Sequence, residues 1–315
     1  MKILVWGAGV IGTLYAGRLQ DAGHQVTVLA RSCRLADIRR YGLVLEDVES
    51  GAQSINWVET AEQLSAEDAY DMALITVRRE QLAEIIPDLM ANKNIPTIVF
   101  MLNNPLGSAD LVDALGADRV VLGFPGAGGT LEGYVVRYVL IAQQPTTIGE
   151  PSGNLTSRLR ALAEEFRASG FRTRIDADMN SWLLSHAFFV TAVTGAIYLA
   201  GGNCERLSHS QTLLNLMISG VREGFNAVCL LAHAVRPFPL KVVFCWLPRP
   251  FAVYYWRHFF SNPMAEHVFA RHALHASAEM HTLAAECHLL VTRSGIAAPA
   301  LNQLYRAIDD FVAAK

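Results

Sequence analysis

The chain has 315 residues, 52% of them hydrophobic and 17% charged, so it is long enough for two domains and too apolar for a disordered protein. Its formal net charge of −3 lacks the basic excess of a nucleic-acid-binding protein, so no nucleic-acid partner is expected. Its five cysteines are scattered and show no C-x-x-C spacing, which is typical of free thiols in a reducing compartment. We therefore expect a cytoplasmic protein without a disulfide framework.

The first predicted elements are a buried strand that starts at Lys2, a glycine-rich turn and a helix. Gly7 allows a tight turn, Gly9 lets backbone N–H groups approach a pyrophosphate, and Gly12 lets the helix pack close to the sheet. A second strand at Gln25–Ala30 completes the context of a dinucleotide site, with the helix N-terminus facing the phosphates. The residues expected to bind the dinucleotide here are Gly7, Gly9, Val10, Ile11 and Gly12.

The tip of the second strand predicts which dinucleotide binds. An NAD site usually has Asp or Glu there, which accepts a hydrogen bond from the ribose 2′-OH. This chain has Arg31 and Ser32, which suit a 2′-phosphate, so NADP(H) is the expected cofactor. The alternative is that Arg31 and Arg34 form only a solvated loop edge.

Strands and helices alternate up to about residue 150. Two apolar runs of buried-strand length, Asp71–Val77 and Pro96–Leu102, flank a predicted helix at Gln81–Met90. This alternation predicts a Rossmann-type, doubly wound parallel sheet, in which ligands bind beyond the carboxyl ends of the strands. The polar residues expected to line that crevice are Arg78, Arg79, Gln81, Asn103 and Asn104. Further strands are expected at Leu43–Asp47, Ser54–Val58, Val120–Gly123, Tyr134–Ala142 and Thr146–Ile148.

From Asn154 onward the pattern changes to helices. We therefore expect an NADP-binding Rossmann domain at 1–150 and an all-α domain for substrate binding or dimerisation at 151–315. Residues 187–200 are apolar nearly all round but too short to span a bilayer, which is typical of a buried core helix. The helices are expected at Leu155–Ala168, Met179–Leu199, Leu207–Ala232 and Met264–Arg293.

The segment 237–260 is unusually aromatic. It carries Trp246, Tyr254, Tyr255 and Trp256 among several phenylalanines, and prolines interrupt it. The prolines argue against a transmembrane helix. An aromatic lid or a homodimer surface is expected, and a membrane-surface patch is the less favoured alternative.

The order of these parts resembles the ketopantoate reductase (2-dehydropantoate 2-reductase) family. The resemblance implies an N-terminal NADPH-binding Rossmann domain, an all-helical C-terminal domain and Asn104 beside the nicotinamide. It covers nearly the whole chain, unevenly. The segments that carry it are 7–12, 70–78, 103–107, 145–150 and 294–299.

One helix departs from the family pattern. The resemblance implies a Lys there as general acid toward the ketone oxygen, with two Asn further along that hold the substrate. Aligned on Trp182 and on Ala196–Ile197, these three positions are Leu184, Phe188 and Ala192. No lysine can replace the missing one by a register shift, because the only lysines are Lys2, Lys93, Lys241 and Lys315.

Other residues could supply a proton. The resemblance implies a substrate-binding Glu at Glu279, and helical spacing places His272 and His275 on the same stripe. A histidine could protonate an alkoxide, and Lys241 could reach in from the aromatic segment. The alternatives are a plain polar stripe and a surface lysine. No metal site is expected because no second ligand cluster is visible, and His186, on the opposite helix face from Leu184, is expected to be structural.

The predicted function is NADP(H)-dependent hydride transfer to a carbonyl or imine of a small substrate held between the domains. The apolar positions of the departing helix indicate a substrate other than ketopantoate, larger and less polar. The alternative is a catalytically inactive NADP(H)-binding sensor or scaffold.

Overall fold

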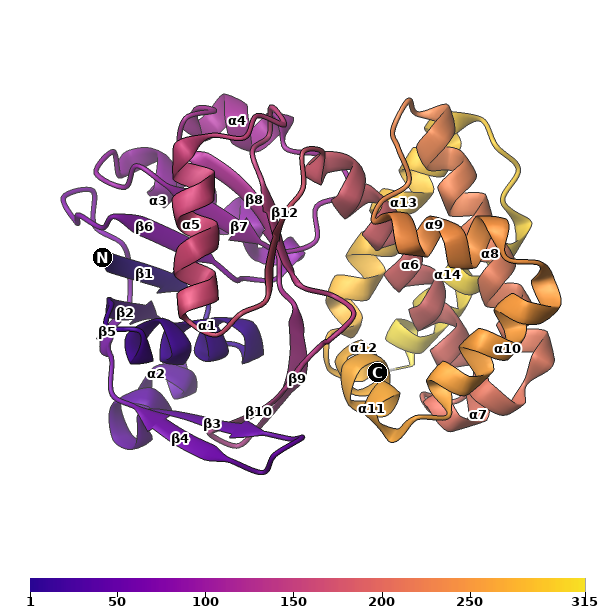
Figure 1. Cartoon of the computed structure of the whole chain (residues 1–315), viewed down its shortest axis with the longest axis horizontal. Coiled ribbons are helices and arrows are strands. Elements are labelled where there is room, and N and C mark those ends of the chain that lie inside the picture. Colours follow the sequence, from indigo (N-terminus) through magenta and orange to yellow (C-terminus); the bar gives the residue numbers. More distant parts are fainter. Residues whose placement is uncertain (315) are drawn as a thin grey trace. The chain divides into compact units, whose positions relative to one another are not determined.

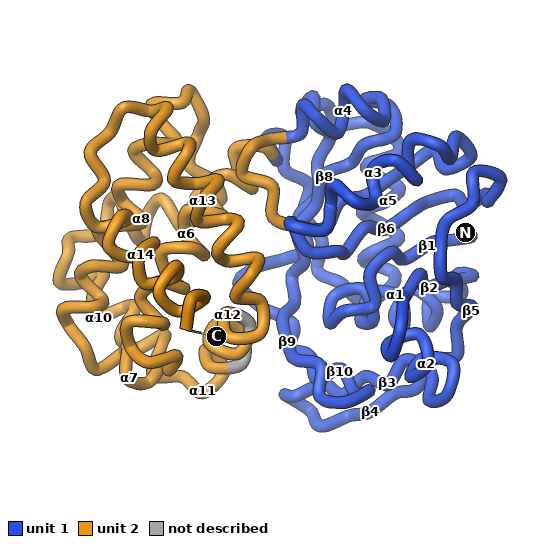
Figure 2. The backbone as a smooth tube through the Cα atoms, turned by 180° about the vertical axis from the view of Figure 1, so that it is seen from behind, with its two compact units in different colours: residues 1–102, 108–179 blue, residues 103–107, 180–315 orange. Residues whose placement is uncertain are grey.

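The computed structural model describes residues 1–314, apart from the side chains of His267 and His272. The chain forms two compact units, coloured separately in Figure 2. The first unit comprises residues 1–102 and 108–179, and the second comprises residues 103–107 and 180–315. The boundary predicted near residue 150 thus falls inside the first unit.

The segment after residue 150 stays with the first unit because it adds a strand to that unit's sheet. Strand β12 (Thr173–Ile175) pairs in parallel with β11 (Thr146–Gly149). The helix before it, α5 (Ser157–Ala168), starts at a Thr156 side chain that accepts a hydrogen bond from the Leu159 N–H. It then buries one apolar face against the unit.

An eight-stranded sheet forms the centre of the first unit (Figure 1). In sheet order its strands are β12, β11, β8 (Val120–Phe124), β7 (Ile98–Met101), β6 (Met72–Ile75), β1 (Lys2–Trp6), β2 (Gln25–Leu29) and β5 (Glu59–Ala61). All neighbours pair in parallel except β11 and β8. The other helices of this unit are α1 (Val10–Asp21), α2 (Ser32–Tyr41), α3 (Leu82–Ala91) and α4 (Ala109–Leu115), with a short 3₁₀ turn at Arg79–Gln81.

Helices cover both faces of this sheet: α5 is in front of it in Figure 1, and α3 and α4 are in front in Figure 2, the view from behind. The strands are therefore buried on both faces, as their continuous apolar runs predicted. The expected Rossmann-type architecture is confirmed. Strand β1 lies between β2 and β6, so the strand order reverses at β1, and ligands bind at such a reversal in open α/β sheets.

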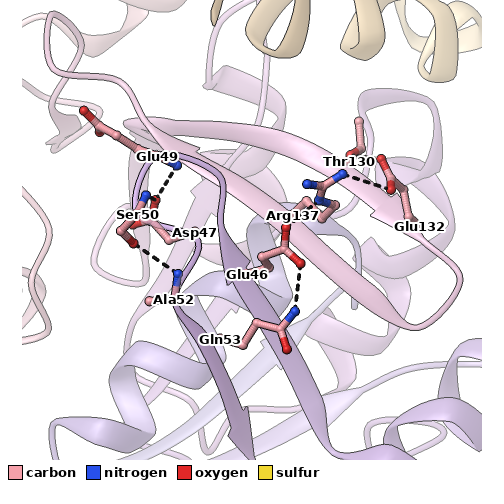
Figure 3. Close-up of polar contacts among 9 residues, drawn as sticks. All are labelled: Glu46, Asp47, Glu49, Ser50, Ala52, Gln53, Thr130, Glu132 and Arg137. Carbon is pink, nitrogen blue, oxygen red and sulfur yellow. Dashed lines mark hydrogen bonds and ion pairs between the residues drawn. The ribbon is translucent and has the colours of Figure 1, made fainter.

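A second, four-stranded sheet belongs to the same unit. Its strands in order are β4 (Gln53–Asn56), β3 (Leu43–Asp47), β10 (Val135–Leu140) and β9 (Ala127–Glu132). Glu46 ties three of them together (Figure 3): it accepts hydrogen bonds from Gln53 Nε2 at 2.9 Å and from Arg137 Nε at 2.8 Å. Both hydrogen bonds lower the pKa of Glu46, and the one from Gln53 has the larger effect. The strand predicted at Ser54–Val58 is β4, which starts one residue earlier and ends two residues earlier than expected.

A buried ion pair fastens α5 to the sheet. Glu150 is 3% exposed and accepts hydrogen bonds from Arg158 Nε at 2.9 Å and from Thr156 Oγ1 at 2.5 Å. Burial acts to raise the pKa of Glu150, but the bonds from Arg158 and Thr156 outweigh it, and the net pKa is lowered.

We expect Arg158→Leu to lower the free energy of unfolding by about 3–5 kcal/mol at pH 7, because it leaves the buried Glu150 charge unpaired. A lowered folded-state pKa means that the pair's contribution is present above the unfolded-state pKa and is lost as pH falls through the folded-state value. The gap between the two proteins in urea unfolding should therefore narrow below about pH 4.5. Exposed Arg160→Leu is the control, and an equal loss there would contradict the assignment.

The second unit is helical. Its long helices are α6 (Met179–Leu199), α8 (Gln211–Leu230), α10 (Arg249–Phe260), α13 (Ser277–Ser294) and α14 (Pro299–Ala313). Its short elements are α7 (Cys204–His209), α9 (Phe238–Lys241), a π-helix at Val242–Trp246, α11 (Pro263–Ala265), a second π-helix at Glu266–Ala270 and α12 (Arg271–His275). The helix predicted from residue 264 to 293 is thus several pieces, and α10 and α14 were not predicted.

Helix α6 runs through the core of the second unit. Within the described residues it is the one helix long and apolar enough to cross a membrane, but 94% of that window is buried in the protein. Small residues let its neighbours approach closely: a Cβ added at Gly195 would lie 2.5 Å from the Leu304 carbonyl of α14. The predicted role as a core helix fits this burial.

The aromatic segment has two sides. Ala252, Val253 and Trp256 of α10 face the core, whereas Trp246 is 59% exposed and Tyr254 is 72% exposed. The amphipathic spacing of α10 accounts for this division.

Candidate active site

A cavity of about 300 Å³ opens at the carboxyl ends of β1, β2 and β6. These are the strands on either side of the order reversal, where a nucleotide is expected. The residues that line it are Trp6, Gly7, Ala8, Gly9, Leu29, Ala30, Arg31, Arg34, Thr76, Val77, Arg78, Gln81, Glu84 and Ile85.

Two glycines are needed for the turn itself. Gly7 has φ +111°, and a Cβ there would come within 2.9 Å of the Thr76 backbone. A Cβ at Gly12 would lie 1.8 Å from the Gly7 carbonyl oxygen, so the start of α1 packs directly on the turn. The Thr76 hydroxyl donates to the Gly7 carbonyl at 2.8 Å and ties the end of β6 to the same turn.

Gly9 is different, because the protein does not require it. Its φ is −75°, which any residue adopts, and an added Cβ would meet no atom of the described residues within 4 Å. Gly9 lines the cavity and immediately precedes α1, whose N-terminal N–H groups favour an anion. The absence of a side chain at Gly9 therefore fits close approach by a phosphate group rather than a need of the fold.

The two arginines at the tip of β2 behave differently. Arg31 is exposed and lines the cavity, and its side chain has no hydrogen bond or ion pair within the described part of the chain. Arg34 is half-buried: its Nε donates to the Ala8 carbonyl and its Nη2 donates to Thr13 Oγ1, both at 2.9 Å. Burial lowers the pKa of Arg34 from its ordinary value. Arg34 thus holds the glycine turn in place, and Arg31 is left to face a ligand.

Five of the residues predicted to bind the cofactor or line its crevice do line the cavity: Gly7, Gly9, Arg31, Arg78 and Gln81. Val10, Ile11, Gly12 and Ser32 lie in the adjacent first turns of α1 and α2 and are not among the lining residues. Thr76, Glu84 and Ile85 were not predicted, although their positions at the end of β6 and on the helix that follows could have indicated them.

Asn103 and Asn104 belong to the second unit, although they follow β7 directly in the chain. The Asn104 side chain donates to the Gly107 carbonyl at 2.6 Å and closes its own loop. Asn103 is 6% exposed, and its Nδ2 donates to Glu279 Oε1 at 3.0 Å across 176 residues of sequence.

The same amide reaches a histidine. Asn103 Oδ1 lies 3.2 Å from His186 Nδ1, and the His186 ring stacks on Trp182 with centroids 5.2 Å apart. Because the Asn103 amide points its N–H at Glu279, its oxygen faces His186, so Nδ1 of the imidazole carries the proton. Glu279, Asn103 and His186 form one buried chain of hydrogen bonds, which we call the Glu279 cluster.

The sequence predicts a structural role for His186, because this residue lies on the opposite helix face from Leu184. The structure shows that its face, rather than that of Leu184, meets Glu279 through Asn103. The spacing of Trp182 and His186, four residues apart on one helix, was the available signal.

Known proteins are similar to this chain in sequence and in fold. Residues 3–153 match the profile described as Ketopantoate reductase PanE/ApbA. This match covers just under half of the chain. The chain is 29% identical to the 2-dehydropantoate 2-reductase of Mesorhizobium japonicum over 203 residues, 58% of this chain and 61% of that protein. It is 27% identical to the uncharacterized oxidoreductase YkpB of Bacillus subtilis over 198 residues, 62% of this chain and 64% of that protein. The matches thus span less than two thirds of these two relatives.

Solved structures share the fold over nearly the whole length. D-mandelate dehydrogenase with NADH and anilino(oxo)acetate superposes with a TM-score of 0.79 at 15% identity, covering 98% of this chain and 97% of that one. A PanE/ApbA family ketopantoate reductase from Ralstonia eutropha gives a TM-score of 0.76 at 19% identity, covering 98% of this chain and 97% of that one. The expected fold, a Rossmann-type unit followed by a helical unit, is therefore confirmed.

The three positions that the sequence alignment assigned to the family's Lys and Asn residues lie in the hydrophobic core. Leu184 is 3% exposed, and Phe188 and Ala192 are fully buried. Phe188 packs against Gly224 of α8, where an added Cβ would lie 2.7 Å from its ring. A Lys or Asn at these positions would be buried in apolar surroundings, so the surrounding packing matches the apolar side chains.

The predicted stripe of His272, His275 and Glu279 is wrong as a continuous helix face. Helix α12 ends at His275 and α13 starts at Ser277, because Ala276 has φ −109° and ψ 32°. Glu279 is buried, whereas His275 is exposed and its Nδ1 bonds the Arg271 carbonyl at 2.7 Å. The side chain of His272 lies outside the described residues.

Lys241 lies at the end of α9, with its Nζ 6.0 Å from the ring centroid of the exposed Trp246. This contact is the cation–π arrangement of a partly exposed lysine. Within the part of the chain that the structure describes, no group of three or more His, Cys, Asp or Glu side chains could hold a metal ion.

Proposed function

We propose that this protein is an NADP(H)-dependent oxidoreductase of the ketopantoate reductase type that acts on a carbonyl compound or imine other than ketopantoate. The observation that carries the proposal is the cavity at the strand-order reversal. It combines a glycine whose missing side chain the fold does not require with an arginine that has no partner within the described residues. Both features fit a phosphorylated dinucleotide.

The residues present fit the cofactor. The N-terminus of α1 and Gly9 would hold the pyrophosphate, and Arg31 would pair with the 2′-phosphate. Bound NADP(H) would supply or accept the hydride. The exposed Glu84 of α3 also lines the cavity, and its carboxylate would accept a hydrogen bond from a ribose hydroxyl group.

The Glu279 cluster is the proposed substrate site of the second unit. Glu279 accepts hydrogen bonds, Asn103 fixes its geometry, and His186 is positioned by the same amide. The relatives support oxidoreductase chemistry with varied substrates, because D-mandelate dehydrogenase shares this fold while others are 2-dehydropantoate 2-reductases. Five free cysteines, three of them exposed, support a reducing, cytoplasmic location.

For cofactor choice we expect NADPH to bind at least ten-fold tighter than NADH, a difference of about 1.4 kcal/mol. Arg31→Ala should remove most of this preference, because the Arg31 side chain lines the cavity and has no partner among the described residues. Arg40→Ala, further along α2 and outside the cavity, is the matched control. Calorimetric titration with both cofactors measures the effect, and equal affinities in the unmutated protein contradict the assignment.

Turnover separates an enzyme from the alternative of an NADP(H)-binding sensor or scaffold. NADPH oxidation is measured against 2-oxo acids, bulky ketones and imines, alongside NADPH affinity. Oxidation with any of these classes supports the proposal. Tight NADPH binding without turnover on all three supports the sensor or scaffold.

A further inference from the structure

Glu279 has an unusual environment for a buried acidic residue. It is 6% exposed, and its one hydrogen bond comes from the neutral amide of Asn103 to Oε1. Across the side chains that the structure describes, no lysine, arginine or histidine forms an ion pair with it. The second carboxylate oxygen, Oε2, accepts no hydrogen bond from these residues either.

A carboxylate in such a place favours a positively charged ligand. Burial removes water from the charge, and a single neutral donor replaces only part of that solvation. A bound cation would recover the loss, because charges interact more strongly away from water. A bound anion, such as the carboxylate of a 2-oxo acid, would add repulsion instead.

The groups around Glu279 fit the same kind of ligand. The nearby rings are aromatic: His186 stacks on Trp182, and Phe189 meets the His186 ring edge-on with centroids 6.1 Å apart. Aromatic faces attract organic cations.

The missing lysine points to the same class of substrate. A ketone needs a proton on oxygen as the hydride arrives, and the family Lys position is a buried Leu184 here. A cationic imine needs none: the hydride and its electron pair join the C=N carbon, and the π pair moves to nitrogen. The nitrogen becomes a neutral amine, and the positive charge passes to the oxidised cofactor.

We propose that the substrate bound at the Glu279 cluster is a cationic imine with an apolar or aromatic substituent, or the corresponding amine in the reverse direction, with Glu279 as its counter-charge. This inference rests on the proposed hydride-transfer function and narrows it from carbonyl compounds in general to iminium ions.

The test compares three probes of similar size in calorimetry, without cofactor and with NADP⁺. They are N-methyl-dihydroisoquinolinium, which is permanently charged, the neutral bicyclic ketone tetralone, and the anion phenylglyoxylate. We expect the iminium to bind at least ten-fold tighter than either of the others. NADPH oxidation should follow the same order, corrected for the reaction without protein.

Variants of Glu279 test whether its negative charge binds the iminium ion. Glu279→Gln keeps the size and the hydrogen bond from Asn103, and it should lower iminium affinity at least ten-fold while NADPH affinity stays the same. Glu279→Asp keeps the negative charge and should retain part of the preference for the iminium ion. It provides the test in place of Glu279→Gln if that variant does not fold. Glu286→Gln, which changes the other glutamate of α13 at a half-buried position, is the control that should leave iminium affinity unchanged.

The outcomes separate this inference from the proposed function. Binding or reduction of tetralone or phenylglyoxylate in preference to the iminium overturns the inference and leaves an NADP(H)-dependent reductase. Iminium binding that Glu279→Gln does not change also overturns it. Failure to bind NADPH overturns the proposed function, while the calorimetry without cofactor still tests the cation site.

Discussion

Gly9→Val is expected to abolish NADPH binding while leaving the melting temperature of the ligand-free protein nearly unchanged. A Cβ at Gly9 meets no described atom within 4 Å, and the backbone there has an ordinary φ of −75°. The valine would instead occupy the space beside the α1 N-terminus where the pyrophosphate is proposed to lie. Calorimetry with NADPH and a thermal melt measure the two halves of the prediction.

Gly12→Val provides the contrast. A Cβ at that position would lie 1.8 Å from the Gly7 carbonyl and 2.5 Å from Thr76 Oγ1, so this variant should lose stability even without ligand. The two glycines thus separate a ligand requirement from a packing requirement within one turn. Full NADPH affinity in Gly9→Val would show that the glycine turn is structural only.

Ketopantoate should be reduced at least a thousand-fold less efficiently by this protein than by a typical family member. Its carboxylate and hydroxyl would lack polar partners at Leu184, Phe188 and Ala192, at about 1–3 kcal/mol for each unpaired group. The resemblance places the family's general acid at Leu184, and its loss would remove a further factor of about 10²–10⁴ in rate. The measurement is kcat/KM with NADPH and ketopantoate. A value typical of the family would show that the alignment of α6 with the family pattern is wrong. Lys241 would then be the first residue to mutate.

Restoring the lysine alone should not rescue this activity. Leu184 is 3% exposed within the core of the second unit, so Leu184→Lys would bury an ammonium group among apolar side chains and destabilise the protein. Leu184→Met, which conserves volume and polarity, is the control for packing at this position. Efficient ketopantoate reduction by a stably folded Leu184→Lys variant would contradict this account.

The sequence by itself determined the central strands of the first unit, most of its helices and the glycine turn with the arginines of the cofactor cavity, but not β5, β9, β12 or α4. Burial faces depend on spacing within one element, and the glycine turn lies between two adjacent elements, so neighbouring residues carry the signal. Arg31 and Arg78 could be predicted because they directly follow β2 and β6, whose carboxyl ends must meet at one edge of a parallel sheet.

Only the tertiary structure decided which polar groups meet. Asn103 and Glu279 are 176 residues apart, and no local pattern relates them. Periodicity extended one helix through Ala276, whereas the structure has a break there, with His275 exposed and Glu279 buried. Likewise the first unit extends to residue 179 because β12 finds its partner in β11. Long-range packing selects among the faces that local spacing allows, and it was this selection that placed His186, rather than the position of the family lysine, beside Asn103 and Glu279.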